Sequence, residues 1–228
     1  MNISGTYITI PVFNHDEHLR RVIQELYKIG FSQIIVVDDG STKDVFANIS
    51  DLNIHFLRHK TNLGQGAALQ TGFEFAKKCN ANYVVSFDAD GQHSAADAEA
   101  VLKPVLNGSA DICLGSRFLT TDSQMIPPSR KRVLKLATFV NYLFTSIKLT
   151  DAHNGLRALN ANALDKLKIT ENRMAHATEI LIEARKHGLR ITEIPVTIHY
   201  TDYSMKHGQS SWNSFRILLD LLLYKLFA

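Results

Sequence analysis

The stretch from Tyr83 to His93 constrains the fold more than any other part of the chain. It begins with an uncharged run of β-branched and aromatic residues, which predicts a buried strand over residues 83–87. Asp88 and Asp90 follow, one residue apart. Because alternate residues of an extended chain point to the same side, Asp88, Asp90 and Gln92 can converge beyond the end of the strand. Three oxygen ligands at this spacing suit Mg²⁺ or Mn²⁺ and do not suit zinc.

A second carboxylate pair, Asp38 and Asp39, follows another apolar run, which predicts a strand over 33–37. Further strands are expected at 6–13, 54–57 and 111–114, with helices from about 14 to 30, at 67–78 and, capped by Ser94, at 95–106. This alternation predicts an α/β fold with a doubly wound, mostly parallel sheet, which binds ligands at the carboxyl ends of its strands. The simpler alternative is that Asp88 or Asp90 only caps the following helix.

The composition limits the class of protein. A chain of 228 residues, 45% of them hydrophobic, can bury one substantial core. The formal net charge of +3 is too small to indicate nucleic acid as a partner. Cys79 and Cys113 lack the spacing of a disulfide framework, so we expect both thiols to be reduced. The N-terminus lacks the pattern of a signal peptide, and no apolar run reaches about 20 residues. These features predict a cytoplasmic protein.

Two segments of the second half indicate a membrane surface. No acidic residue lies between Asp122 and Asp151, and a largely apolar helix expected over 129–148 begins with a basic cluster. Such a helix is typical of a surface that faces anionic lipid, although a core helix with a solvated basic start fits the same pattern. Residues 212–228 predict a second apolar helix, which lies on a membrane, packs against a partner or docks on the sheet. We therefore expect one domain over 1–211, followed by this helix.

A glycine-rich turn, 62–68, opens the helix expected at 67–78. Leu69 occupies the third position required of a dinucleotide fingerprint, and the Lys-Ser/Thr pair of a P-loop is absent. The turn is either a close approach of the backbone to a ligand or only a tight connection between strand and helix.

These pieces, in this order, resemble the family 2 glycosyltransferases of the GT-A fold, and most of all the synthases that attach sugars to dolichyl or polyprenyl phosphate. The resemblance runs from residue 6 to about 211. Each of its motifs is weak alone, but together and in order they are specific. The motifs are the segments 11–14, 36–41, 62–67, 88–93, 115–117, 151–157 and 193–196.

The resemblance also implies roles for particular residues. Those expected at the UDP- or GDP-linked donor are Pro11, Phe13, Asp38, Asp39 and Asp88, and those expected to hold Mg²⁺ or Mn²⁺ between its phosphates are Asp88, Asp90 and Gln92. Those expected at a phosphate or the acceptor are Arg117, Arg132, Arg157, Lys206 and His207. The catalytic candidates among all of these are Asp90 and Arg117, together with Asp151.

The acceptor decides whether a general base is needed. A polyprenyl phosphate is already an anion near neutral pH, because the second pKa of a phosphate monoester is ~6. A glycan hydroxyl needs a base, for which Asp151 and Glu179 are the candidates. We expect metal-dependent, inverting transfer to a polyprenyl phosphate at the cytoplasmic face of the membrane, with transfer to a glycan hydroxyl as the alternative. A small membrane-spanning protein is a further candidate partner for the terminal helix.

Two departures from the pattern leave the base and sugar of the donor open. His15 stands where the synthases usually carry an acidic residue, and Gln65 where many relatives carry lysine. Residues 209–212 lack the arginine of the processive polymerases. A phosphatase of the haloacid dehalogenase type is a rival class, but Gly91 stands where those enzymes usually place Thr or Val. A non-catalytic, membrane-docked adaptor is a second rival, against which the intact carboxylates argue.

Overall fold

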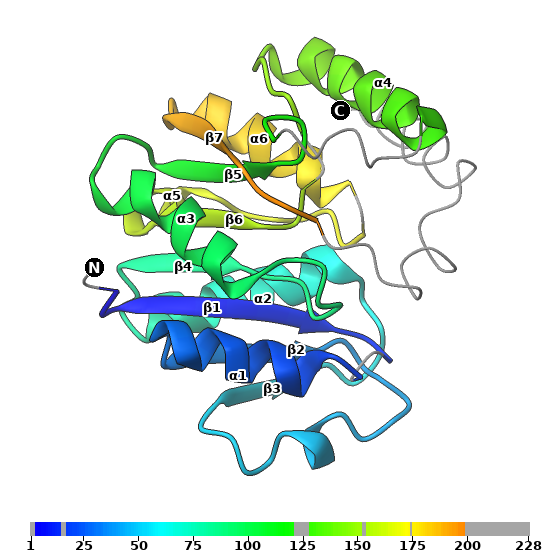
Figure 1. The fold of residues 1–228 in the computed structure, drawn as a ribbon, viewed down its shortest axis with the longest axis vertical. Coiled ribbons are helices and arrows are strands. Elements are labelled where there is room, and N and C mark those ends of the chain that lie inside the picture. Colours follow the sequence, from blue (N-terminus) through cyan, green and yellow to red (C-terminus); the bar gives the residue numbers. More distant parts are fainter. Residues whose placement is uncertain (1–2, 15–16, 121–127, 152–153, 174, 199–228) are drawn as a thin grey trace.

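The computed structural model describes residues 3–14, 17–120, 128–151, 154–173 and 175–198 (Figure 1). Its strands are β1 (Thr6–Val12), β2 (Gln33–Asp38), β3 (His55–Arg58), β4 (Tyr83–Ser86), β5 (Ile112–Ser116), β6 (Arg157–Asn160) and β7 (Ile191–Pro195). They form a single sheet in the order β3-β2-β1-β4-β6-β5-β7. β6 pairs antiparallel with β4 and β5, and the other pairs are parallel. The predicted α/β class with a mostly parallel sheet is therefore confirmed.

Helices cover both faces of the sheet. They are α1 (Leu19–Ile29), α2 (Gln65–Lys78), α3 (Ala95–Leu106), α4 (Pro128–Thr145), α5 (Ala161–Lys166) and α6 (His176–Lys186), and a short 3₁₀ helix spans Phe46–Asn48. α1 and α3 pack on one face, and α2, α5 and α6 on the other (Figure 1). α4 lies at the end of the molecule beside α6.

Local chemistry accounts for the elements that the sequence predicts best. In β2, Ile34, Ile35, Val36 and Val37 are all fully buried, as expected of a parallel strand with helices on both sides. α1 ends at Gly30, whose φ of 106° is left-handed and whose N–H donates to the carbonyl of Tyr27. α3 begins with a capping box, in which Ser94 and Asp97 satisfy each other's backbone N–H groups.

The structure differs from the sequence predictions in the second half. β6 and α5 were not predicted, because a four-residue strand followed by a six-residue helix is too short to show a period. β7 is an edge strand and ends at Pro195, which is where a sheet tolerates a proline. Within the described residues, no helix is long and apolar enough to cross a bilayer. The helix predicted at 212–228 lies outside the described residues.

Candidate active site

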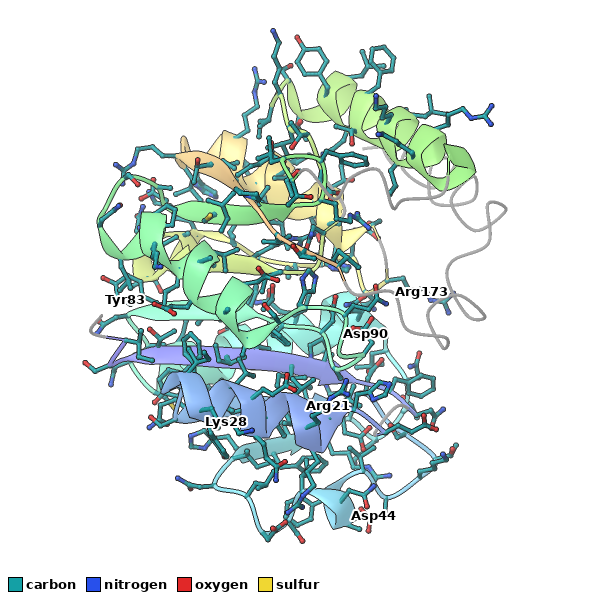
Figure 2. All side chains as sticks on the ribbon, in the orientation of Figure 1. Arg21, Lys28, Asp44, Tyr83, Asp90 and Arg173 are labelled. Carbon is teal, nitrogen blue, oxygen red and sulfur yellow. The ribbon has the colours of Figure 1, made fainter. Side chains whose placement is uncertain are left out.

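The Asp-x-Asp segment lies at the carboxyl end of β4, as predicted. Figure 2 shows Asp90 at this end and Tyr83 at the other end of the strand. The side-chain amide of Gln65, at the start of α2, donates to Asp88 Oδ1 over 3.0 Å. Gln92 donates twice to Asp90, from its backbone N over 3.0 Å and from its side chain over 2.7 Å. The two carboxylates are thus held by neighbours on the glycine-rich turn and on their own loop.

The electrostatics show that these carboxylates repel each other. Burial and the charge of Asp90 raise the pKa of Asp88 to about 6, although Arg157, Gln65 and Arg117 oppose the shift. Burial also raises the pKa of Asp90, against the hydrogen bonds from Gln92 and the charge of His18. Two partly buried carboxylates with raised pKa values are typical of a site that receives a cation.

The donor atoms fit a hard divalent cation. Asp88 and Asp90 supply carboxylate oxygens, and Gln92, whose amide nitrogen faces Asp90, can supply its carbonyl oxygen. Among the residues that the structure describes, no group of three or more His, Cys, Asp or Glu side chains could hold a metal. A Mg²⁺ or Mn²⁺ ion bound by one or two carboxylates is typically completed by substrate phosphates, so these residues fit a metal that binds together with the donor.

The glycine-rich turn packs against the protein itself. A Cβ on Gly66 would lie 2.0 Å from the carbonyl oxygen of Glu171, and one on Gly64 would lie 2.1 Å from that of Asn172. The backbone N of Gly66 donates to Asn172 over 2.9 Å. Close packing against the segment at 171–172, which precedes α6, therefore accounts for both glycines, a reason that neither interpretation of the turn named. Arg173 borders the turn on the side of Asp90 (Figure 2).

Asp39, predicted at the nucleoside, holds this turn in place. Its oxygens accept from the backbone N of Leu63 and of Gly64 over 2.9 and 2.7 Å, and from the side chain of Asn62 over 2.9 Å. The ring of His59 lies 2.7 Å from the same carboxylate and 2.9 Å from Thr71 on α2. The sequence did not single out His59. With these partners Asp39 has a clear structural role, and its contact with a nucleoside stays a prediction.

The loops after β1 and β2 are tied together beside it. Asn14, in a left-handed conformation with φ 54°, donates its backbone N to Ser41 and accepts from the backbone N of Thr42. Asp38 is fully buried, with one oxygen on the N–H of Ser41 and the other 3.2 Å from Arg58. Phe13 is 40% exposed, so its ring is accessible to a planar ligand. Pro11 is half-buried on β1.

Arg117 and Asp151 form a buried pair. The guanidinium donates to the two carboxylate oxygens over 2.6 and 2.8 Å, and the backbone N of Arg117 donates as well. Glu193 on β7 accepts from the backbone N of Asp151 and of Thr150, which fixes the segment that carries Asp151. This contact gives Glu193, the first residue of the motif at 193–196, a role that the sequence did not reveal. Both carboxylate oxygens of Asp151 therefore accept hydrogen bonds from the guanidinium of Arg117, so this carboxylate is poorly suited to act as a general base.

The other predicted residues lie in different settings. Arg157 is only 4% exposed and donates to the carbonyl of Asn154, so the structure places it inside the protein and not on an acceptor surface. Arg132 is exposed on α4. Glu179, the other candidate base, is bound by the backbone N of Thr170 and of Glu171 and serves to hold that segment. Lys206 and His207 lie outside the described residues.

Comparison with known proteins identifies the family. Residues 7–168 match the model described as glycosyl transferase family 2. The chain belongs to glycosyltransferase family 2. A UDP-N-acetylglucosamine–dolichyl-phosphate N-acetylglucosaminyltransferase of Methanococcus voltae is 31% identical to this family 2 glycosyltransferase over 96% of the chain and 96% of the relative. Polyprenol monophosphomannose synthase of Mycolicibacterium smegmatis is 25% identical over 92% of the chain and 83% of the relative.

A solved structure confirms the GT-A fold. Glucosyl-3-phosphoglycerate synthase from Mycobacterium tuberculosis, in complex with Mn²⁺, UDP and glucosyl-3-phosphoglycerate, superposes with a TM-score of 0.69. The match covers 94% of this chain and 78% of that one, at 16% identity. The fold is therefore of the GT-A type. The match to the family model confirms the expected enzyme class, a glycosyltransferase.

Proposed function

We propose that this glycosyltransferase transfers a sugar from a nucleotide diphosphate to a polyprenyl phosphate at the cytoplasmic face of a membrane. The names of the relatives from Methanococcus voltae and Mycolicibacterium smegmatis support this acceptor class. The observation that carries the proposal lies in α4, whose amphipathic character is reversed relative to that of an ordinary surface helix.

On α4, polar side chains face the protein and apolar side chains face outward. Asn141 and Thr145 are buried, and Arg185 of α6 donates to the carbonyl of Thr145. Leu136, Phe139 and Leu143 are 56%, 57% and 55% exposed. These three, with Tyr142, recur three or four residues apart, so they form one outward stripe.

The outward stripe of α4 continues into basic residues. Arg132, one turn before Leu136, and Lys135, directly before it, are both exposed, and no acidic residue lies between 123 and 150. An apolar stripe with flanking cations matches the interface of an anionic bilayer, where the apolar side chains enter the acyl boundary and the cations remain at the headgroups. A polyprenyl phosphate carries its reactive group in that headgroup layer, beside α4.

The chemistry of the site agrees with a phosphate acceptor. A divalent cation at Asp88 and Asp90 would act as a Lewis acid on the leaving diphosphate. Asp151 accepts two hydrogen bonds from the guanidinium of Arg117 and so fixes its orientation. The charge of Arg117 then lies near the carboxyl end of β4, where negative charge develops on the leaving diphosphate. The acceptor phosphate needs no proton removed at neutral pH. An Asp151 that only orients Arg117 is therefore sufficient for this acceptor and insufficient for a hydroxyl.

A transfer assay with purified full-length protein tests the proposal. Nucleotide sugars based on UDP and GDP are incubated with a short-chain polyprenyl phosphate in detergent and Mn²⁺, without any glycan. We expect a sugar–phosphate–lipid product, whose anomeric configuration is inverted relative to the donor. The matched acceptor is the corresponding polyprenol, which carries no phosphate and should give no product. Transfer only to a glycan hydroxyl, abolished by Asp151→Asn, would support the alternative acceptor and overturn the proposal.

A further inference from the structure

Arg157 is a buried cation behind the metal-binding carboxylates. It is the first residue of β6 and pairs across the sheet with Ser86, the last residue of β4, two positions before Asp88. Its side chain is 4% exposed, and its Nε donates to the carbonyl of Asn154 over 3.1 Å. Buried arginines are rare unless carboxylates compensate them; burial lowers the pKa of Arg157, and the charges of Asp88 and Asp151 oppose that shift.

Gly155 brings Asp88 to this arginine. A Cβ on Gly155 would lie 2.2 Å from Asp88 Oδ2, so only glycine leaves room for the carboxylate. Ser86 Oγ donates to the carbonyl of Gly155 over 2.7 Å, which fixes the strand end against β4. In the antiparallel register that pairs Ser86 with Arg157, Asp88 lies two residues beyond Ser86 and Gly155 two residues before Arg157, so the two are neighbours across the strand ends. Asp88 is thus seated between the amide of Gln65 and the start of β6.

We propose that Arg157 is a positioning residue that acts as the fixed internal counter-ion of Asp88, so that the divalent metal binds tightly only together with a nucleoside diphosphate. The inference rests on the donor and metal side of the proposed function, and it is independent of the acceptor. It replaces the expectation that Arg157 contacts an acceptor or a phosphate.

Charge balance gives the physical reason. Asp88, Asp90 and Asp151 carry three negative charges; Arg117 pairs with Asp151, and Arg157 offsets one of the other two from inside the protein. The remaining charge attracts a divalent ion weakly, but the phosphates of the donor restore the attraction and complete the coordination. A positive charge beside an aspartate lowers the affinity of that carboxylate for a proton by about tenfold or more. The affinity for a dication should fall by at least as much. Metal would then leave with the nucleotide after transfer.

Mn²⁺ titrations followed by electron paramagnetic resonance test this inference on the full chain, with UDP, with GDP and with no nucleotide. For the wild type we expect Mn²⁺ affinity to rise about tenfold or more when the matching nucleotide is present. Arg157→Gln should tighten the binding of Mn²⁺ alone by about tenfold and reduce the effect of nucleotide. Arg157→Lys retains the charge and should resemble the wild type. Arg190→Gln is the matched control, because it removes an arginine from the opposite end of the sheet.

The outcomes separate a counter-ion from a structural or a ligand-binding residue. A structural role predicts weaker Mn²⁺ binding in Arg157→Gln, and a direct phosphate contact predicts weaker nucleotide binding in both variants; either result overturns the inference. If Arg157→Gln does not fold, the inference is tested by the effect of nucleotide on Mn²⁺ affinity in the wild type and in Arg157→Lys. Equal Mn²⁺ affinity with and without nucleotide, or no Mn²⁺ binding with either, overturns it as well. Transfer to polyprenyl phosphate is measured separately, so failure of the proposed acceptor leaves these results interpretable.

Discussion

Asp90 provides the sharpest test at the scale of single residues. Burial raises the pKa of both carboxyls, and the charge of Asp90 raises that of Asp88 further; Asp90→Asn removes this charge, so the variant should fold with unchanged or slightly higher stability. Because the carboxylate is a metal ligand in the proposed mechanism, and metal stabilisation of a leaving group is worth several kcal/mol, kcat should fall by at least about a hundredfold. Excess EDTA should inactivate the wild type. Initial rates of transfer, with thermal melts for folding, measure both effects.

The control for Asp90 makes the same chemical change far from the site. Asp44 is exposed, accepts only from the nearby backbone N of Ala47 in the described structure, and lies well away from Asp90 (Figure 2). Asp44→Asn should retain the activity of the wild type. Full activity of Asp90→Asn, or of the wild type in EDTA, would contradict the metal role.

At the scale of elements, α4 should bind the protein to anionic vesicles. Each exposed Lys or Arg near such a surface contributes about 1 kcal/mol, so Arg132→Gln combined with Lys135→Gln should weaken binding by roughly thirtyfold at low salt. Leu136→Ser with Phe139→Ser should weaken it at low and high salt alike, because apolar burial is not screened. Flotation on vesicles with and without phosphatidylserine measures both variants. The control pair, Lys28→Gln with Lys78→Gln, removes the same charge from other helices.

At the scale of the whole molecule, Asp111 joins three strands at the end of the sheet opposite Asp90. It accepts from the guanidinium and backbone N of Arg190 and from the amide of Asn160, and these bonds hold its pKa well below the usual range. The stability that a carboxyl with a lowered pKa contributes is present above about pH 4 and is lost as the pH falls further. Asp111→Asn should therefore lower the urea midpoint at pH 7, and the difference from the wild type should shrink below pH 4.

The control for Asp111 is a second arginine–aspartate pair that is more exposed. Arg20 and Asp51 form bonds of 2.6 and 2.7 Å, but their side chains are 42% and 62% exposed. Solvent screens such a pair, so Asp51→Asn should change the urea midpoint much less than Asp111→Asn. Equal effects of the two substitutions, or a difference for Asp111→Asn that persists unchanged to pH 2, would contradict the assignment.

Local chemistry let the sequence predict the first half of the fold. The strands that became β1, β2 and β4, the stop of α1 at Gly30 and the cap of α3 at Ser94 follow from apolar runs, a left-handed glycine and a capping box. Each of these signals lies within a few residues of the element that it defines. The position of Asp88 and Asp90 followed as well, because a central strand delivers its carboxyl end to the ligand-binding edge of an α/β sheet.

Only the tertiary structure decided how the residues of the site are paired. Arg117 contacts Asp151, 34 residues away, because the end of β5 and the start of β6 lie at the same edge of the sheet. Glu193 fixes the segment that carries Asp151. Arg157 lies behind Asp88 because β6 enters between β4 and β5 in the reverse direction. Strand order and direction are set by contacts between distant parts of the chain. A sequence signal that extends over a few residues therefore predicts which polar groups lie at the ligand-binding edge, and only packing decides which of them pair with one another and which are buried inside.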